Sequence, residues 1–341
     1  MRSYSSILSY TTLCALAVLA VKLGILNAYV QLVLMYVGIN IILSTSLNIV
    51  NGYMGEFSVG HAGFMAVGAY VTSVLNVMLF TTSSIFGPPL LSPSSAIYLF
   101  PVTLIAGGAA AAFAGLLVAV PSFKTRGDYL AIITLAVNYI VKSSIENIQP
   151  IGGARGFMGM RNVIDSMQAV VNLPWTMIWV LISVGATVWI IQRLVNSTYG
   201  KGIVALRDDE IAAEIMSVNT QRMKIVAFML SSGLAGIAGG LFAHVLGYIN
   251  PGTFTIMKST EALVMVYLGG MGSLSGSVMS AIIFTLALEA FRPLQVIKWV
   301  AVPFLLILLM LFRSEGIMGN RELTDVFPSL RKWFAPSEGR V

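Results

Sequence analysis

The stretch from Ile97 to Val120 reads IYLFPVTLIAGGAAAAFAGLLVAV and contains no acidic or basic side chain. A helix of about 20 mostly apolar residues crosses the hydrocarbon core of a bilayer. This run is long enough to do so. It therefore predicts a chain that threads a membrane.

The composition of the whole chain agrees with that prediction. Hydrophobic residues make up 57% of the 341 residues and charged residues 10%, whereas soluble domains carry about 25% charged residues. A lipid bilayer accepts an apolar exterior that water would not. The net charge of +6 does not indicate a nucleic-acid-binding protein, because the basic residues stand between apolar runs, as the positive-inside rule expects.

Comparable apolar runs recur along the chain. They lie near 7–26, 29–50, 60–80, 129–148, 173–193, 223–247 and 296–312. The run 7–26 follows a basic residue, as a signal peptide would, but no small-x-small cleavage site follows it, so we predict a retained first helix. Its Cys14 is the single cysteine and can form no internal disulfide.

The stretch 261–290 is longer than one span needs and contains Gly269-Gly270-Met271-Gly272. Each glycine weakens a helix by about 1 kcal/mol relative to alanine. We therefore predict two shorter segments there, broken or re-entrant. The predicted fold is an all-α polytopic membrane protein, a single domain over 1–341 with about 8–10 transmembrane helices.

The distribution of basic residues predicts an orientation. If 261–290 is a hairpin and the N-terminus is cytoplasmic, most basic residues fall in cytoplasmic segments, including the tail 314–341. These residues are Arg2, Lys124, Arg126, Arg193, Lys201, Arg207, Arg222, Lys224, Arg313, Arg321, Arg331, Lys332 and Arg340. Both termini are thus expected on the cytoplasmic side of a prokaryotic inner membrane.

The sequence contains no phosphate-binding G-x-x-x-x-G-K-[ST] motif and no H-E-x-x-H zinc motif. Its two histidines, His61 and His244, are far apart. We therefore expect no catalytic residue, no metal and no cofactor on this chain.

The segment from Asn51 to Gly63 joins two apolar runs and places Glu56 and His61 at or near membrane depth. Ionisable groups there are costly unless they are paired or hydrated. One interpretation is a broken helix along a solute path, with Glu56, Ser58, Gly60 and His61 as candidate residues. The other is a plain turn with a solvated Glu56 and a His61 bonded to a neighbouring helix.

Met54-Gly55-Glu56-Phe57-Ser58 resembles Met271-Gly272-Ser273-Leu274-Ser275, since both read Met-Gly-x-(Phe/Leu)-Ser. Interrupted segments at corresponding places in two halves are typical of transporters built from repeats. This adds Gly269, Gly270 and Gly272 to the candidate path. Alternatively, both are sites of close helix packing.

The loop 197–217 predicts an amphipathic helix after Gly202, with Arg207 pairing with Glu210 or Glu214. An exposed cytoplasmic helix of this kind can bind a partner protein. The alternative is a helix lying on lipid, which its acidic residues disfavour. A further segment, from Lys124 to Leu135, predicts a helix start capped by Asp128.

Together these segments resemble the permease subunits of branched-chain amino acid ABC importers, the LivM type. The resemblance rests on Gly52–Phe64, Arg126–Leu135, Gly200–Glu214, Ala235–Gly240 and Tyr267–Gly272, and runs from about residue 40 to 312. Two departures are Lys142, where relatives often carry arginine, and the turn Gly152–Gly156. Urea and short-amide importers use the same type of subunit.

The resemblance implies a type II ABC importer permease-like fold and a set of partners. These are a second, LivH-type permease, two ATP-binding subunits that hold ATP and Mg²⁺, and an extracytoplasmic substrate-binding protein. It also implies that 197–217 is the loop that couples to the ATPases, with Gly200, Arg207, Glu210, Ala212, Ala213 and Glu214 as its residues. An ion-coupled carrier and a non-transporting membrane scaffold or sensor are the alternatives of other classes.

Overall fold

The computed structural model describes residues 2–83, 85–123 and 129–292, together with 300, 304, 307, 311, 316–319 and 322; for residues 2–9 it describes the backbone. The predicted cap at Asp128, most of the predicted span 296–312 and most of the tail 314–341 lie outside these residues. The described part is almost entirely helical.

The helices are α1 (Arg2–Lys22), α2 (Ala28–Asn48), α3 (His61–Phe80), α4 (Ala96–Ser122), α5 (Tyr129–Asn147), α6 (Met160–Val170), α7 (Trp175–Val195), α8 (Thr198–Asp208), α9 (Glu210–Ile215), α10 (Thr220–Leu246), α11 (Ile256–Gly269) and α12 (Leu274–Ala290). A π-helical turn, Ile49–Tyr53, prolongs α2. Short 3₁₀ turns occupy Pro93–Ser95, Gln149–Ile151, Gly153–Arg155 and Pro251–Thr253.

Six helical segments of the described chain are long and apolar enough to cross a membrane. They are Ala28–Tyr53, His61–Phe80, Pro93–Ser122, Tyr129–Asn147, Trp175–Val195 and Thr220–Leu246. Shorter apolar helices cover Tyr10–Lys22 and Leu274–Ala290. The predicted class, an all-α polytopic membrane protein, is confirmed.

Helix α10 lies at the centre of the bundle, packed against α4, α3 and α2. Glycines let these backbones approach closely: a Cβ on Gly68 would lie 2.2 Å from Gly236 Cα, and one on Gly239 would lie 1.9 Å from the Met65 carbonyl oxygen. Small residues serve this purpose between membrane helices, where no hydrophobic force draws them together.

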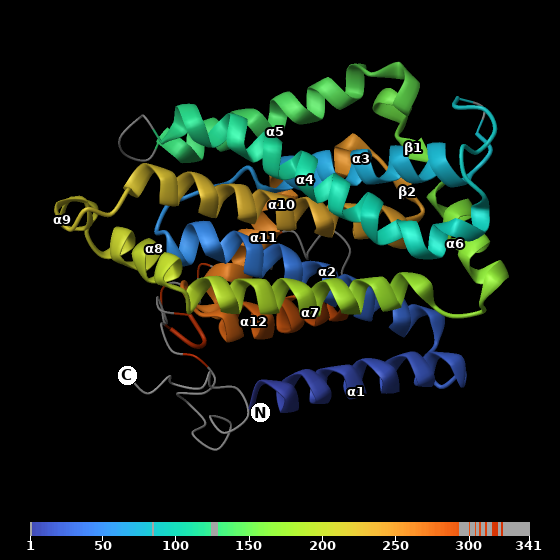
Figure 1. Ribbon diagram of the computed structural model, residues 1–341, viewed down its shortest axis with the longest axis horizontal. Helices are drawn as coiled ribbons and strands as arrows, with labels where there is room; N and C mark the ends of the chain where they lie inside the picture. The colour runs from blue at the N-terminus through green and yellow to red at the C-terminus, as the bar shows by residue number, and fades with distance from the viewer. Residues whose placement is uncertain are drawn as a thin grey trace.

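The two ends of the bundle differ (Figure 1). Helices α8 and α9 lie at one end, whereas α6 and the short antiparallel pair β1 (Phe157–Met158) and β2 (Tyr248–Ile249) lie at the other. The sequence analysis did not predict α6. It is too short for a span, but its buried residues Met160, Val163 and Met167 repeat at helical spacing.

The stretch 261–290 forms an antiparallel helical hairpin. Helix α11 ends at Gly269 and α12 begins at Leu274. Ser280 Oγ donates to the Met265 carbonyl oxygen at 2.5 Å, and Gly276 packs on Gly269, where a Cβ would lie 2.5 Å from Gly276 backbone atoms. The start of α11 and the end of α12 therefore lie toward the same end of the bundle.

Candidate functional site

The first helix break runs from the π-helical turn to the start of α3. Between Tyr53 and His61 the chain leaves the helical conformation, and Gly55 adopts a left-handed φ of +76°. Val59 N donates to Thr134 Oγ1 of α5 at 3.2 Å, and a Cβ on Gly60 would lie 2.2 Å from the Thr134 carbonyl oxygen. Glycine at position 60 thus lets the break lie directly on α5.

The second break, between α11 and α12, meets the first. Asn48 Nδ2 donates to the Ser273 carbonyl oxygen at 2.9 Å, and Gly272 N donates to Asn48 Oδ1 at 3.0 Å. A Cβ on Gly52 would lie 2.4 Å from Gly272 N. The two glycine-interrupted segments are therefore in direct backbone contact.

The similar pentapeptides share one backbone feature. Gly55 and Gly272 each follow a methionine, and their φ values are +76° and +81°. Residues other than glycine rarely adopt this left-handed conformation. The common Met-Gly pair thus corresponds to a common turn geometry at both breaks.

His61 is buried at the start of α3 and is bonded to α2. Its Nε2 lies 2.8 Å from Ser46 Oγ, and Ser231 Oγ of α10 donates to the Ser46 carbonyl oxygen at 2.6 Å. Glu56 is bonded elsewhere, so the two ionisable residues of the break do not pair with each other. Ser58 and Gly60 are buried beside them.

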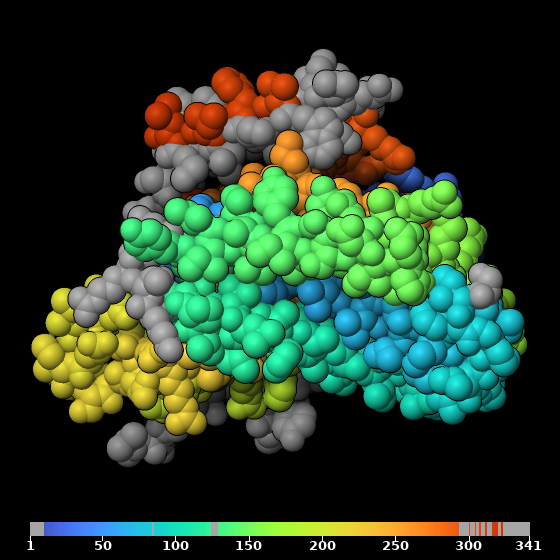
Figure 2. Space-filling model, turned by 90° about the horizontal axis from the view of Figure 1, so that it is seen from above, coloured from blue at the N-terminus to red at the C-terminus, as the bar shows by residue number. Residues whose placement is uncertain are grey.

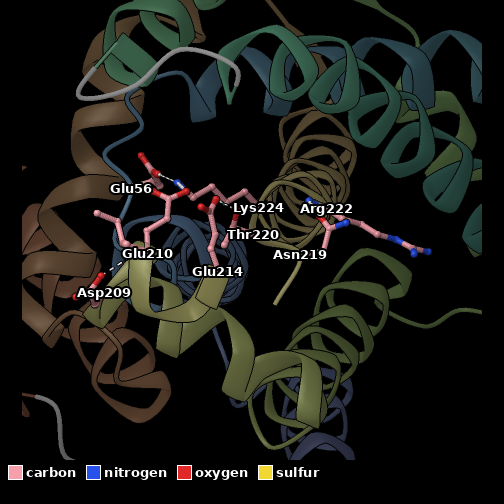
Figure 3. A network of polar contacts seen from close by, with 9 residues as sticks. Glu56, Asp209, Glu210, Glu214, Asn219, Thr220, Arg222 and Lys224 are labelled. Carbon is pink, nitrogen blue, oxygen red and sulfur yellow. Dashed lines mark hydrogen bonds and ion pairs between the residues drawn. The ribbon is translucent and has the colours of Figure 1, made fainter. Parts of the chain in front are cut away.

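Glu56 belongs to an ion-pair network with α9 and α10 (Figure 3). Lys224 Nζ lies 2.7 Å from Glu56 Oε1 and 2.8 Å from Glu210 Oε1. The side chain of Lys224 is 11% exposed, against 24% for Glu56 and 47% for Glu210. One lysine therefore joins the first helix break to the surface loop, and Glu56 is not the solvated residue of a plain turn.

The surface loop is two helices rather than the single amphipathic helix predicted after Gly202. Asp209 has an extended backbone between α8 and α9. Its Oδ1 accepts from Ile211 N at 2.9 Å and from Ala212 N at 3.0 Å. A short acidic side chain competes with the helical backbone in this way, which ends one helix and caps the next.

The predicted pairing of Arg207 with Glu210 or Glu214 is wrong, because the break at Asp209 separates them. Arg207 Nη2 lies 3.3 Å from Asp208 Oδ1, and Arg207 Nη1 donates to the Gly52 carbonyl oxygen at 3.3 Å. Glu214 instead accepts from Thr220 Oγ1 at 3.0 Å. Arg207 is thus a second link from the loop to the helix breaks.

The base of the loop is anchored at the start of α8. Ser197 Oγ accepts from Gly200 N at 3.1 Å, and a Cβ on Gly200 would lie 2.2 Å from the Leu194 carbonyl oxygen. Tyr199 Oη donates to the Arg222 carbonyl oxygen at 3.3 Å. Burial raises the pKa of the Tyr199 phenol, and the Arg222 guanidinium opposes this shift.

Helix α9 presents apolar side chains to the outside. Ile211 is 72% exposed, Ile215 77% and Met216 78%, whereas Ala213 is buried and Ala212 is exposed. Large exposed apolar residues that cluster on a polar loop are typical of a surface that contacts another protein or a membrane. The sequence analysis missed Ile211 and Ile215, although their i, i+4 spacing was visible.

Glu322 is a further residue that the sequence analysis missed. Its carboxylate accepts from Leu274 N at 2.8 Å and from Ser275 N at 3.1 Å, which caps α12. Tyr53 Oη also donates to it at 3.4 Å. Among the described residues, no group of three or more His, Cys, Asp and Glu side chains is arranged to hold a metal ion.

Comparison with known proteins identifies the family. The profile of the family described as "Branched-chain amino acid transport system / permease component" matches residues 29–312. The chain belongs to this family. It is accordingly a transport permease of a multi-component ABC system and a multi-pass membrane protein.

Individual relatives agree with this family. The chain is 31% identical to the Escherichia coli high-affinity branched-chain amino acid permease protein LivM, over 82% of this chain and 68% of that protein. It is 22% identical to a probable LivM of Methanocaldococcus jannaschii, over 91% and 99% of the two chains. The E. coli LivH protein is 29% identical over 41% of this chain and 49% of its own length. No solved structure matched the chain.

Proposed function

We propose that this chain is the membrane-spanning permease subunit of a binding-protein-dependent ABC importer for branched-chain amino acids. One observation carries the mechanism: the α8–α9 loop is joined to the two helix breaks through Lys224 and Arg207. The names of the relatives favour branched-chain amino acids over urea and short amides.

The loop is the proposed seat of the partner ATPases. Its exposed Ile211, Ile215 and Met216 would fill an apolar groove of the ATPase. The nearby acidic residues would pair with basic groups of the ATPase and thereby fix its position on the loop. ATP and Mg²⁺ would be bound by the ATPase subunits, because this sequence has no phosphate-binding loop. This proposal places the α8–α9 end and both termini on the cytoplasmic side.

Alternating access follows from the connections of the loop. A displacement of α9 by the ATPases would pull on Lys224 and thereby on Glu56, while α8 would act on the Gly52 carbonyl through Arg207. The two breaks are in contact, so a shift of one would displace the other. A population shift between two packed arrangements would then open the path to either side in turn.

The remaining partners are a second permease and an extracytoplasmic binding protein. The similarity to LivH over part of the chain supports a pair of related permeases. The opposite end of the bundle, with α6 and the β1–β2 pair, would receive the binding protein. The complete importer would lie in a prokaryotic inner membrane.

The test is uptake by the complete importer reconstituted in vesicles. We expect ATP-dependent accumulation of labelled leucine, isoleucine or valine, and none when the ATPase subunits are omitted. Accumulation driven by an ion gradient without ATP would contradict the proposal. Uptake of urea in preference to all three amino acids would contradict its substrate.

A further inference from the structure

Helix α11 carries an ion pair that the proposed coupling does not use. Lys258 Nζ lies 2.7 Å from Glu261 Oε2, and the side chains are 16% and 18% exposed. The next residues of the helix face the core, with Ala262, Leu263 and Val264 buried. The pair therefore marks one charged patch at the start of an otherwise apolar helix.

The pair lies within the membrane-spanning bundle rather than above it. Lys258 Nζ lies 5.8 Å from the centroid of the Phe242 ring, and that ring is 6.1 Å from the ring of Tyr36. Tyr36 is eight residues into α2, roughly 12 Å along the helix from its start at Ala28. Beside the pair, Ser259 Oγ accepts from the backbone N of Ala62, in the first turn of α3, at 2.9 Å.

Charged side chains at such depth are costly and mark paths for polar solutes. An ion pair that served α11 alone could be replaced by neutral residues of similar size without loss of stability. The position of this pair between α3, α10 and the exterior is therefore a reason to look for a ligand.

Both side chains of the pair have hydrogen-bonding groups that no other described residue uses. Within the described residues, Lys258 Nζ donates to Glu261 alone, which leaves two of its three hydrogens, and Glu261 Oε1 accepts no hydrogen bond. The neighbouring Met257 is 52% exposed and Thr260 is exposed. The pair is therefore bordered by exposed residues of its own helix, and both of its side chains keep a small exposed fraction.

The chain just before α11 lies beside α5. In Figure 2, orange atoms from the part of the chain that includes α11 are visible beside the green helix α5. The 3₁₀ turn Pro251–Thr253, just before α11, packs against α5. The aromatic residues Phe242, Phe254 and Tyr70 form a continuous buried cluster behind the pair.

We infer that Lys258 and Glu261 receive the two charges of a zwitterionic amino acid, Lys258 binding its α-carboxylate and Glu261 its α-ammonium group. A lysine and a carboxylate side by side match these opposite charges, and a single ionic ligand would satisfy only one of them. The inference rests on the proposed function and adds the groups of the substrate that the permease itself recognises.

The experiment measures equilibrium binding of labelled leucine to the complex of the two permeases and the two ATPase subunits, with the binding protein omitted. Leucinamide, which lacks the carboxylate, and N-acetylleucine, which lacks the ammonium group, serve as competitors. We expect both analogues to compete at least about tenfold more weakly than leucine with the unaltered complex, since each loses a charge-assisted hydrogen bond.

Each variant should lose one kind of discrimination. Lys258→Met should weaken leucine binding about tenfold or more and abolish the preference for leucine over leucinamide. Glu261→Gln should abolish the preference for leucine over N-acetylleucine and leave the preference for leucine over leucinamide unchanged. A purely structural role would not separate the two analogues, so this pattern identifies the contacts.

The matched control is the partly exposed pair Lys142–Glu146 of α5, whose charged atoms are 3.6 Å apart. The double variant Lys142→Met, Glu146→Gln should bind leucine as the unaltered complex does. Unchanged leucine binding in the double variant Lys258→Met, Glu261→Gln would overturn the inference. Failure of every variant at this pair to assemble would overturn it as well. ATP-dependent leucine uptake by the unaltered complex shows separately whether the proposed function holds.

Discussion

Lys224→Met should uncouple the surface loop from the first helix break. The substitution removes both ion pairs of Lys224, at 2.7 and 2.8 Å, while keeping an unbranched side chain of similar length. The bond to Glu56, which is 24% exposed, is a charge-assisted hydrogen bond of about 1.5–3 kcal/mol. The pair with Glu210, 47% exposed, contributes about 0–1 kcal/mol.

The two losses together weaken the attachment of α9 to the first helix break by about 1.5–4 kcal/mol. Every 1.4 kcal/mol is a tenfold change in an equilibrium. The ratio of complexes with α9 attached to the break to those with α9 detached should fall on the order of tenfold or more. We expect slower leucine uptake per ATP hydrolysed, because loop movement no longer reaches the break.

Two assays check this prediction in the reconstituted importer. Hydrogen exchange should be faster at the backbone of 209–216 in the variant, and the ratio of leucine transported to ATP hydrolysed should drop. The control is Lys201→Met, since Lys201 is exposed on α8 and forms no ion pair among the described residues. Unchanged exchange and an unchanged transport ratio in Lys224→Met would refute the reasoning.

Three further predictions concern the same region. Glu210→Lys places a second positive charge beside Lys224 and should abolish ATPase-coupled uptake; unimpaired uptake in vesicles would contradict the loop's role. Gly52→Ala would bring a Cβ to 2.4 Å from Gly272 N and should lower thermal stability and yield of the folded subunit, a prediction that an unchanged melting temperature would contradict. Asp209→Ala should destabilise α9 by about 1 kcal/mol, seen as faster amide exchange in its first turn, with unchanged exchange counting against the cap.

Local sequence determined the membrane character of this chain. A transmembrane helix is specified by its own composition, so long apolar runs such as Ile97–Val120 predicted their spans without knowledge of any neighbour. The same holds for the break within 261–290, because glycine weakens a helix wherever it stands. The family resemblance likewise rested on contiguous motifs.

Tertiary structure decided how the candidate site is connected. The contact of Gly52 with Gly272 and the ion pair of Glu56 with Lys224 join residues more than 160 positions apart. Helical periodicity relates residues three or four apart, so it assigned Arg207 to Glu210 and could not foresee that Asp209 would cap a new helix between them. The partners of a charged side chain depend on which helices pack together, and only the assembled bundle specifies that.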